Sequence, residues 1–523
     1  MSDGALFDPP EILNIADFFL GDRLRDGHAD RPAIRTADGS LTYAEVTAMA
    51  ARYGRVLSGL GVRQEERVLI ALPDTPDFPA ALFGILAIGA VGVMVNPDQR
   101  PDDLAAILEY TRATWVVVGG DYLTGFETAA ATSTRTPGFL VVGGESSRHP
   151  VMENEASGVA HDWATVATHR DDPAIWLFSG GTTGRPKAVV QTHRSYANTA
   201  VCYGHHTVGY RPDDVTISVP KLYFGYATGS NLFFPFSVGA TSVLFAERPA
   251  PEVLFEQIAR HHPTILVNVP SMVNAMVSHP DAATADLSSL RFATSAGEAL
   301  PEGLYHRWKD TFGVELLDGL GTAEMWHIFV SNRPEDVRPG TVGKVVPGFD
   351  VRVADPDGRP LPDGEVGRLW VRGGSRAIAY WQNMEQTADA FRGDWYASSD
   401  LVSRDADGYF THRGRADDAI KVKGKWLRPQ EVEDCLLAHP AVETCAVVGA
   451  EDEAGLMKPY AFVVAKEAGA PPAPLAAELQ RWVLDRLEAY KHPRRVIVVD
   501  ALPETHLGKV DRGRLRQRVR TPN

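Results

Sequence analysis

A glycine-rich loop at residues 178–187 carries groups that could grip phosphate oxygens. Its sequence is Phe-Ser-Gly-Gly-Thr-Thr-Gly-Arg-Pro-Lys, and the apolar run 175–178 predicts a buried strand that leads into it. Glycines allow backbone N–H groups to turn towards an anion without a Cβ clash. The candidate phosphate ligands of this loop are Ser179, Gly180, Gly181, Thr182, Thr183, Gly184 and Lys187.

The spacing of the loop differs from that of a Walker A loop. That pattern ends in Lys followed by Ser or Thr, whereas Gly184 is followed here by Arg185 and Pro186. Taken alone, such a loop is as compatible with a plain connecting turn as with a nucleotide site. Motifs elsewhere in the chain are needed to decide between the two.

Five further motifs follow in order, and together with the loop they resemble the signature of the adenylate-forming (AMP-binding) superfamily. They are Asp318-Gly-Leu-Gly-Thr-Ala-Glu324, Gly340-Thr-Val-Gly343, Trp395-Tyr-Ala-Ser-Ser-Asp400, Gly414-Arg-Ala-Asp-Asp-Ala-Ile-Lys421 and Leu502-Pro-Glu-Thr-His-Leu-Gly-Lys509. The superfamily contains acyl- and aryl-CoA ligases, adenylation domains of peptide synthetases and firefly luciferase. Segments 221–240 and 318–332 are most similar to benzoate–CoA and 2-aminobenzoate (anthranilate)–CoA ligases. The resemblance covers nearly the whole chain.

The resemblance implies an ATP-dependent aryl-CoA ligase that forms an acyl-adenylate and then a thioester with coenzyme A. It implies that Lys509 bridges the substrate carboxylate and the α-phosphate, where a cation is needed. Thr183, a hydroxyl donor of the phosphate loop, is also expected to be a catalytic residue. Glu324 is expected to hold Mg²⁺ against the phosphates. Asp400 is expected to accept from the ribose hydroxyls, with Arg415 near the ribose and phosphate.

The adenine site is expected at the ends of two predicted strands, where open α/β folds bind ligands. The adenine site is predicted to consist of Ala296, Gly297, Glu298, Asp318, Gly319, Leu320, Gly321 and Thr322. The acid pocket is expected to be apolar and small, with aromatic rings that can stack on an aryl ring. Its candidate residues are Tyr223, Phe224, Tyr226, Ala227, Gly297, His327 and Ile328, each of which could instead be an ordinary core residue.

The second half-reaction needs another arrangement, because the thiol of coenzyme A must reach the carbonyl that Lys509 served. The resemblance implies a rotation of the C-terminal domain about a hinge at Asp417. Lys423, Gly424 and Lys425 are then expected to line the channel for coenzyme A.

The elements that must position these groups alternate between helical and short apolar β segments as far as about residue 350. This alternation predicts a layered α/β architecture. A small β-rich subdomain is predicted from Val351, where turns such as 355–358 and 405–408 punctuate the chain. We therefore expect a large N-terminal AMP-binding domain at 1–416 and a smaller, mobile α+β domain at 417–523.

Composition narrows the class of protein. The chain has 523 residues with a net charge of −15, which argues against nucleic acid or an anionic membrane as the main partner. Residues 80–95 are apolar but predict a core helix and a strand rather than a membrane span. Three cysteines without metal spacing and the absence of a basic leader favour a cytoplasmic protein. The oligomeric state stays open, with a homodimer as one option.

Alternatives remain at this point. The same motifs would serve an adenylation enzyme that loads a carrier-protein phosphopantetheine, a luciferase-like oxidation, or a nucleotide-binding regulator without turnover. Lys509, Glu324 and Asp400 together argue against the regulator. The chain departs from the common pattern at Ala188, at Glu504 and at Ser398-Ser399, where the superfamily usually has Gly, Lys and Thr-Gly. The identity of the acid is not decided by the sequence.

Overall fold

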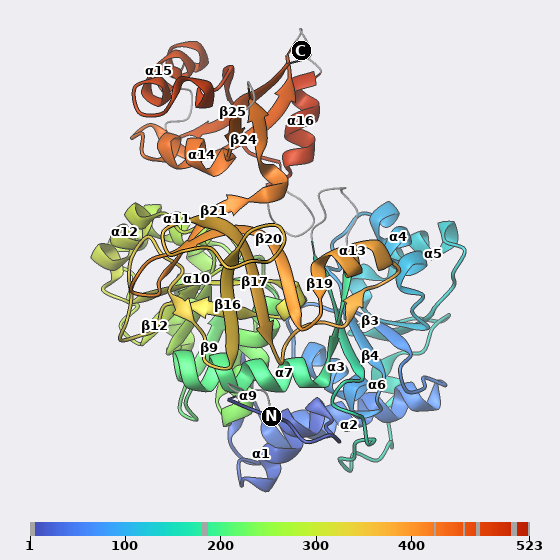
Figure 1. The fold of residues 1–523 in the computed structure, drawn as a ribbon. Helices are drawn as coiled ribbons and strands as arrows, with labels where there is room; N and C mark the ends of the chain where they lie inside the picture. Colours follow the sequence, from blue (N-terminus) through green and yellow to red (C-terminus); the bar gives the residue numbers. More distant parts are fainter. Residues whose placement is uncertain are drawn as a thin grey trace. The chain divides into compact units, whose positions relative to one another are not determined.

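A computed structural model describes residues 6–179, 187–422, 425–452, 456–466, 471–503 and 510–520. Within these ranges the chain forms two compact units (Figure 1). The first contains residues up to 179, 187–351 and 371–396, and the second contains 352–370 and the residues from 397 onwards. The mixed α/β class predicted from the sequence is confirmed, while the predicted division at residues 416 and 417 stays a prediction.

The first unit contains a seven-stranded sheet. Its order is β18 (Ala379–Tyr380), β8 (Lys187–Thr192), β7 (Pro173–Ser179), β4 (Val91–Met94), β3 (Arg67–Ala71), β5 (Trp115–Gly119) and β6 (Gly138–Val142). Helices α4 (Pro101–Thr111) and α5 (Leu123–Thr132) share a buried apolar cluster with these strands. The apolar run at 80–95 forms α3 (Asp77–Ala87) and β4, as predicted, and α3 packs on α2 (Tyr43–Gly59). The predicted phosphate loop begins at the end of β7 in this sheet.

A nine-stranded sheet carries most of the predicted site. Its order is β15 (Lys344–Val345), β14 (Ile328–Ser331), β13 (Leu316–Gly321), β12 (Phe292–Ser295), β11 (Ile265–Asn268), β9 (Val215–Ser218), β10 (Thr241–Val243), β1 (Pro32–Thr36) and β2 (Gly39–Thr42). The strands from β13 to β1 are parallel. Helices α10 (Pro251–His261), α11 (Pro270–Ser278) and α12 (Glu302–Phe312) share one apolar cluster with them. The carboxyl ends of β12 and β13 therefore lie side by side.

Short helical segments complete the first unit. They are η1 (Asp17–Gly21), α1 (Asp22–Arg25), η2 (Gly120–Tyr122), α6 (Met152–Glu155), α7 (His193–Thr199), η3 (Ala200–Val208), α8 (Gly225–Thr228), η4 (Gly229–Phe233), α9 (Phe234–Val238), η5 (Pro280–Ala283), η6 (Ala323–Met325) and α13 (Met384–Ala390). Several of them follow one another without a break. In the part of the chain that the structure describes, no helix is both long and apolar enough to cross a membrane.

The β-rich segment predicted after Val351 forms a five-stranded sheet. Its order is β16 (Phe349–Ala354), β17 (Val366–Gly373), β20 (Trp395–Arg404) and β19 (Phe391–Arg392), with β21 (Phe410–Arg415) paired to β20. The turns fall where the sequence places them: the N–H groups of Gly358 and Gly408 donate to the carbonyls of Asp355 and Asp405. Both glycines have φ near +85°, a conformation that glycine adopts without strain.

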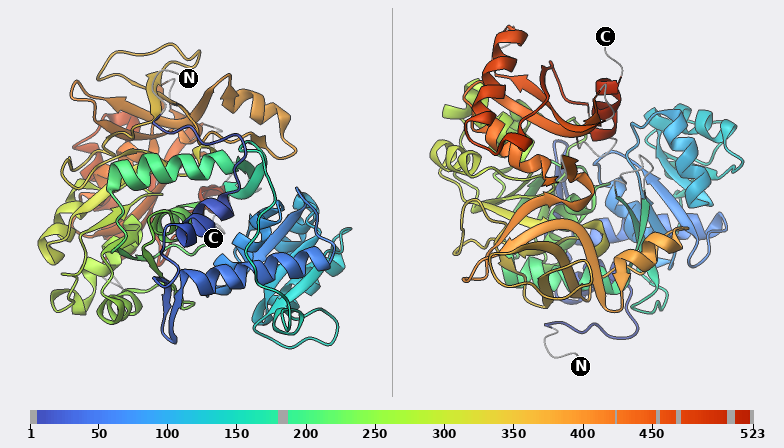
Figure 2. Two further views of the ribbon diagram at one scale, coloured as in Figure 1. Left: turned by 90° about the horizontal axis from the view of Figure 1, so that it is seen from below. Right: turned by 45° about the horizontal axis from the view of Figure 1, so that its top comes forward.

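The C-terminal part of the second unit sandwiches a three-stranded sheet between helices. The sheet contains β24 (Val442–Glu451), β25 (Met457–Ala465) and β26 (Arg495–Val498). Alternate residues of β24 face opposite sides: Val447 packs towards α14 (Pro429–Leu437) and α15 (Pro472–Leu484), whereas Val448 packs with Leu515 of α16 (Arg512–Arg520). Figure 1 and the right view of Figure 2 show these helices on the two faces of the sheet.

Three short elements complete the second unit: η7 (Ala416–Asp418), the hairpin of β22 (Ile420–Val422) and β23 (Lys425–Leu427), and η8 (Ala489–Lys491). The sequence pattern of residues 473–489 predicts a single helix, whereas α15 ends earlier, at Leu484. The N–H groups of both Arg486 and Leu487 donate to the Val483 carbonyl, which closes the helix in a turn.

Candidate functional site

The predicted adenine site lies at the carboxyl ends of two adjacent parallel strands. Ser295, the last residue of β12, stands in register with Asp318 of β13. Asp318 is buried, and this burial raises the pKa of its carboxyl group well above the usual range. Its carbonyl accepts from the backbone N–H and the side-chain amide of Asn332. Strand pairing thus places this buried carboxyl group at an edge of the sheet where ligands commonly bind.

Small residues keep the backbone accessible on both sides of Asp318. Gly297 has φ +90°, so a larger residue there would be strained. A Cβ on Gly321 would collide with the backbone of His327, which passes directly beside it. Glu298 accepts from the N–H and the hydroxyl of Ser271, so this part of the predicted adenine site is tied to the first turn of α11. Leu320 and Thr322 are half-buried along the same strand end.

Glu324 lies in η6, immediately after β13, with only 7% of its surface exposed. Its Oε1 accepts a hydrogen bond of 2.8 Å from the Tyr380 hydroxyl, and its carbonyl accepts from Ala377 N–H. Over the residues that are described, no cluster of three or more His, Cys, Asp or Glu side chains forms a ready-made metal site. One oriented carboxylate fits Mg²⁺, which usually takes one or two protein carboxylates and completes its shell with substrate phosphates and water.

The two ends of the phosphate loop are fixed by strand pairing. Ser179 ends β7 and Lys187 begins β8, and the two residues pair with each other in an antiparallel ladder. The ammonium group of Lys187 lies 5.2 Å from the centre of the Tyr380 ring. Tyr380 therefore contacts both the predicted metal ligand and the cation of the phosphate loop.

A strained turn separates Glu324 from the acid pocket. Trp326 has φ +62° and ψ −48°, and the N–H of His327 donates to the carbonyl of Met325 at 2.9 Å. This is a γ-turn of the rare, strained kind, which persists only where the surroundings enforce it. The Trp326 ring is buried and lies 4.1 Å from that of Tyr196, so packing supplies that enforcement.

The turn directs His327 into an aromatic cluster. Its Nε2 lies 3.1 Å from both the Tyr226 carbonyl and the Ser230 hydroxyl. Burial lowers the pKa of His327 to about 3, although the hydrogen bond to the Tyr226 carbonyl acts in the opposite direction and raises it. The ring is therefore neutral, and because a carbonyl can only accept, the proton is assigned to Nε2. Its Nδ1 is left as a buried acceptor.

Of the other predicted pocket residues, Tyr226 lies close to this histidine, whereas Tyr223 and Phe224 contact each other. The rings of Tyr226 and His327 are 5.4 Å apart, and Tyr226 shares a hydrogen bond of 2.7 Å with Thr294 of β12. Ala227 and Ile328 are buried. Tyr223 and Phe224 are half-buried and lie 4.5 Å from each other. The structure thus brings Tyr226 and His327 together and places Tyr223 and Phe224 as a separate pair.

In the second unit, Asp400 and Arg415 stand opposite each other on β20 and β21. Arg415 lies 3.5 Å from Asp400 Oδ1, His412 Nε2 lies 3.3 Å from the same oxygen, and Ser398 donates to Oδ2. Burial alone would raise the pKa of Asp400, but these donors outweigh it and hold the pKa well below its usual range. Asp400 is therefore ionised throughout the working pH range. Ser399, where the superfamily usually has Gly, accepts from Arg415.

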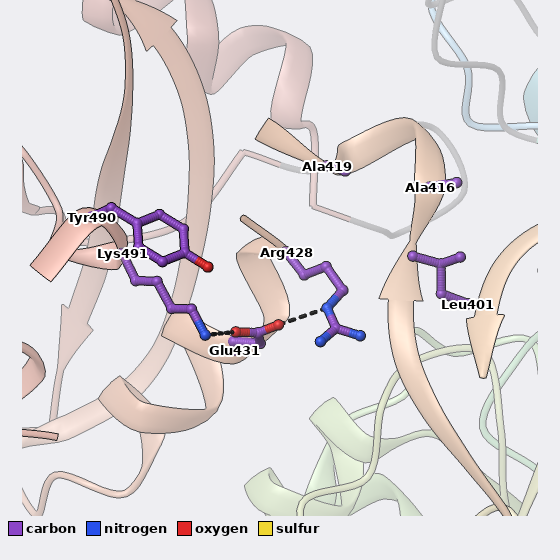
Figure 3. A pocket seen from close by; sticks show the side chains of 7 residues that line it. All are labelled: Leu401, Ala416, Ala419, Arg428, Glu431, Tyr490 and Lys491. Carbon is purple, nitrogen blue, oxygen red and sulfur yellow. Dashed lines mark hydrogen bonds and ion pairs between the residues drawn. The ribbon is translucent and has the colours of Figure 1, made fainter. Parts of the chain in front are cut away.

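The predicted hinge lies beside a cavity of about 440 Å³. Arg415 Nη2 is 3.4 Å from Asp417 Oδ2 in η7. Figure 3 shows Glu431 of α14 between two cations on the cavity wall: Lys491 Nζ and Arg428 Nε each lie 2.6 Å from one of its oxygens. Lys425, predicted for the coenzyme A channel, lies 4.8 Å from the ring of Tyr490, which also lines the cavity.

Several predicted residues lie outside the described part of the chain. They are Gly180, Gly181, Thr182, Thr183 and Gly184 of the phosphate loop, Lys423 and Gly424 of the channel, and Lys509. Their assignments stay predictions.

Two residues beside the predicted ones were missed by sequence reasoning. Tyr380 gave no local signal, because it reaches Glu324 from 56 positions away. His412 could have been found: the turn at 405–408 pairs Arg404 with Phe410, and counting back along the hairpin places His412 opposite Val402, next to Asp400.

Comparisons with known proteins agree with this arrangement. The family described as "AMP-binding enzyme" matches residues 22–381, and "AMP-binding enzyme C-terminal domain" matches residues 431–509. A benzoate–CoA ligase of Thauera aromatica is 40% identical over 97% of this chain and 96% of its own length.

Two solved structures are similar over almost the whole chain. An anthranilate CoA ligase in complex with anthranoyl-AMP is 36% identical, with a TM-score of 0.92 and 98% of each chain covered. A benzoate CoA ligase from Burkholderia xenovorans LB400 is 38% identical, with a TM-score of 0.88, and covers 97% of this chain and 100% of its own. The family matches and the relatives point the same way: the chain belongs to the AMP-binding enzyme family.

Proposed function

We propose that this protein is an ATP-dependent aryl-CoA ligase that converts a small aromatic carboxylic acid, of the benzoate or 2-aminobenzoate type, into its CoA thioester. The observation that carries the proposal is the likeness, along nearly the entire chain, to ligases of these two acids. The neutral aromatic surroundings of His327 support an aryl substrate, because flat rings stack there at little cost.

In the first half-reaction a carboxylate oxygen attacks the α-phosphorus of ATP. The bond from that phosphorus to the bridging oxygen breaks, and pyrophosphate leaves with the electron pair. Negative charge grows on the non-bridging oxygens, so the residues that matter are those that position the reactants and supply positive charge. We assign that charge to Lys509 and Lys187, with Thr183 and the rest of the loop as hydrogen-bond donors.

Glu324 is the residue we assign to hold Mg²⁺, which would supply charge neutralisation to the phosphates when bound. Tyr380 fixes the orientation of this carboxylate through the bond to Oε1. On the second unit, Asp400 is assigned to the ribose hydroxyls. Its donors from His412, Arg415 and Ser398 leave further lone pairs for ribose, since a carboxylate accepts about four hydrogen bonds.

In the second half-reaction the sulfur of coenzyme A attacks the acyl carbonyl, the thiol proton is lost, and AMP leaves as the C–O bond breaks. We assign the hinge to Asp417 and the channel to Lys423, Gly424 and Lys425. The ion pair between Arg415 and Asp417 supports a role for this segment in coupling the nucleotide to the hinge. A cytoplasmic location and a homodimer remain proposals from the sequence.

The test is the release of AMP from ATP and Mg²⁺, with and without CoA. The acids are benzoate, 2-aminobenzoate, the hydroxybenzoates, cinnamate and a medium-chain fatty acid. CoA-dependent turnover with a small aryl acid is expected. Acid-dependent pyrophosphate exchange without a gain from CoA would point to a carrier-protein acceptor instead, and no response to any acid would contradict the proposal.

A further inference from the structure

A buried carboxylate holds the start of the segment that carries the acid pocket. Asp74 lies between β3 and α3 and is 5% exposed. Its Oδ1 accepts a hydrogen bond of 2.9 Å from the backbone N–H of Leu222, which is itself fully buried. The two residues are 148 positions apart in the chain. Leu222 directly precedes Tyr223 and Phe224, so this bond fixes the point from which both rings project.

The neighbouring Lys221 carries a positive charge opposite to that of Asp74. Its ammonium group donates to the Phe245 carbonyl at 2.6 Å and lies 3.8 Å from the centre of the Phe245 ring. Burial lowers the pKa of Lys221, and the charge of Asp74 opposes this. Burial raises the pKa of Asp74 to about 6, and Lys221 and the Leu222 N–H oppose it. The two charges therefore compensate each other in the interior.

The far end of the segment is fixed as well. The Thr228 hydroxyl donates to the Leu222 carbonyl at 2.5 Å and contacts the Phe224 carbonyl at 2.9 Å. Tyr226 is tied to Thr294. A short stretch that is anchored at both ends has few alternative conformations, so the position of its rings depends on its anchors.

We propose that Asp74 is a positioning residue for the aromatic acid: through the Leu222 N–H and the charge of Lys221, it sets where Tyr223 and Phe224 stand against the substrate ring. The inference rests on the proposed aryl-CoA ligase function. Among the described residues, the hydrogen bond of the Asp74 side chain and its charge partner both belong to this segment. The affinity for the acid is therefore expected to depend on Asp74 and the affinity for ATP is not.

Two variants separate the charge from the hydrogen bond. Asp74→Asn keeps an oxygen that can accept from Leu222 but removes the charge, whereas Asp74→Ala removes both. A matched control is Asp77→Asn, because Asp77 lies one turn away and its carboxylate accepts from Tyr53 of α2 instead of the pocket segment. All four proteins are compared by acid-dependent pyrophosphate exchange, with the KM of the acid and of ATP measured separately and folding checked by thermal unfolding.

For Asp74→Ala we expect the KM of the acid to rise about tenfold, the cost typical of losing a hydrogen bond to a charged group, with the KM of ATP within about twofold of the wild type. Asp74→Asn is expected to show a smaller rise. The Asp77→Asn control is expected to leave both constants unchanged. Should Asp74→Ala fail to fold, Asp74→Asn and the pH profile still decide the question.

The pH profile is the readout that a purely structural role would not move. As pH falls through about 6, Asp74 gains a proton and loses its attraction to Lys221, so the wild-type KM for the acid is expected to rise. The substrate stays ionised there, because ordinary carboxyl groups have pKa values near 4. Other titratable groups among the described residues also face this region: Lys221 faces Glu247, and the adjacent Tyr223 faces Asp98 and Tyr122. Asp74→Asn is expected to flatten the profile.

An equal rise in the KM of acid and ATP, or an unchanged KM for the acid in Asp74→Ala, would overturn the assignment. So would an Asp74→Asn profile that follows the wild type between pH 5.5 and 7.5. These results are distinct from failure of the proposed function, because that failure appears in the wild type as the absence of exchange with any aryl acid.

Discussion

The hydroxyl group of Tyr380 donates to Glu324 Oε1 at 2.8 Å, and the same tyrosine ring lies 5.2 Å from the ammonium group of Lys187. One side chain thus contacts both the predicted metal ligand and the predicted phosphate cation. Tyr380 stands on the short edge strand β18, which pairs with β8, the strand that Lys187 begins. The geometry of the predicted triphosphate site therefore depends on an edge strand from a distant part of the sequence.

Tyr380→Phe is expected to raise the KM of Mg·ATP about tenfold, because a hydrogen bond to a charged group contributes about 1.5–3 kcal/mol. The KM of the acid should stay within about twofold of the wild type, since Glu324 is assigned to the metal and not to the acid pocket. Tyr305→Phe is the matched control: Tyr305 makes the same kind of bond, 2.6 Å long, to Glu315 of the α12 region. An equal effect of the two substitutions on Mg·ATP would contradict the role of Tyr380.

His412 is expected to affect the affinity for ATP through its contact with Asp400. His412→Ala removes one of the donors that hold Asp400, so the KM of ATP should rise about three- to tenfold. Isothermal titration with ATP checks this directly. His149 makes a similar contact of 2.9 Å with Glu127 in the first unit, and His149→Ala is expected to leave ATP binding unchanged. Unaltered ATP affinity in His412→Ala would remove His412 from the site.

The hinge prediction separates the two half-reactions. Asp417→Pro fixes φ near −65° and is expected to spare pyrophosphate exchange while suppressing thioester formation. Lys509→Ala should do the reverse, with adenylation lowered about 10²–10³-fold, as for the loss of other electrostatic groups at a reacting centre. Single-turnover assays that start from ATP and acid, or from a synthetic acyl-adenylate and CoA, measure the two steps separately. Equal loss of both steps in Asp417→Pro would contradict the hinge assignment.

The C-terminal unit should depend on one buried ion pair. Arg512 of α16 donates to Glu433 Oε1 at 2.6 Å and to the Val447 carbonyl at 2.8 Å, and Glu433 is 4% exposed. Arg512→Met leaves that carboxylate buried without its partner and is expected to cost about 3–5 kcal/mol in unfolding free energy. The double variant Arg512→Met/Glu433→Met should recover much of the loss, because it removes the unpaired charge. Denaturant unfolding of Arg512→Met, of Glu433→Met and of the double variant, each compared with the wild type, tests this; a double variant that is less stable than both single variants would contradict it.

The elements that the sequence predicts well are those whose own residues decide them. The run Trp-Val-Val-Val-Gly at 115–119 by itself predicts a buried strand, because a strand buried on both faces is apolar throughout, and β5 has these bounds. The turns that contain Gly358 and Gly408 are equally predictable from the sequence. The contact from Asp74 to Leu222 was not, since it depends on the pairing of segments 148 residues apart. The neutral state of His327 likewise follows from burial that only the packed structure reveals.

The γ-turn at Trp326 bears on any attempt to redesign this enzyme for other acids. His327 is an obvious position to vary, yet the turn at residues 325–327 that carries it directly follows Glu324. A substitution that lets the turn relax to an unstrained φ is expected to displace both side chains, so a gain in pocket size would disturb the predicted metal ligand. Directed evolution of substrate range is therefore expected to succeed first through the Tyr223 and Phe224 pair, which belongs to a segment anchored independently of Glu324.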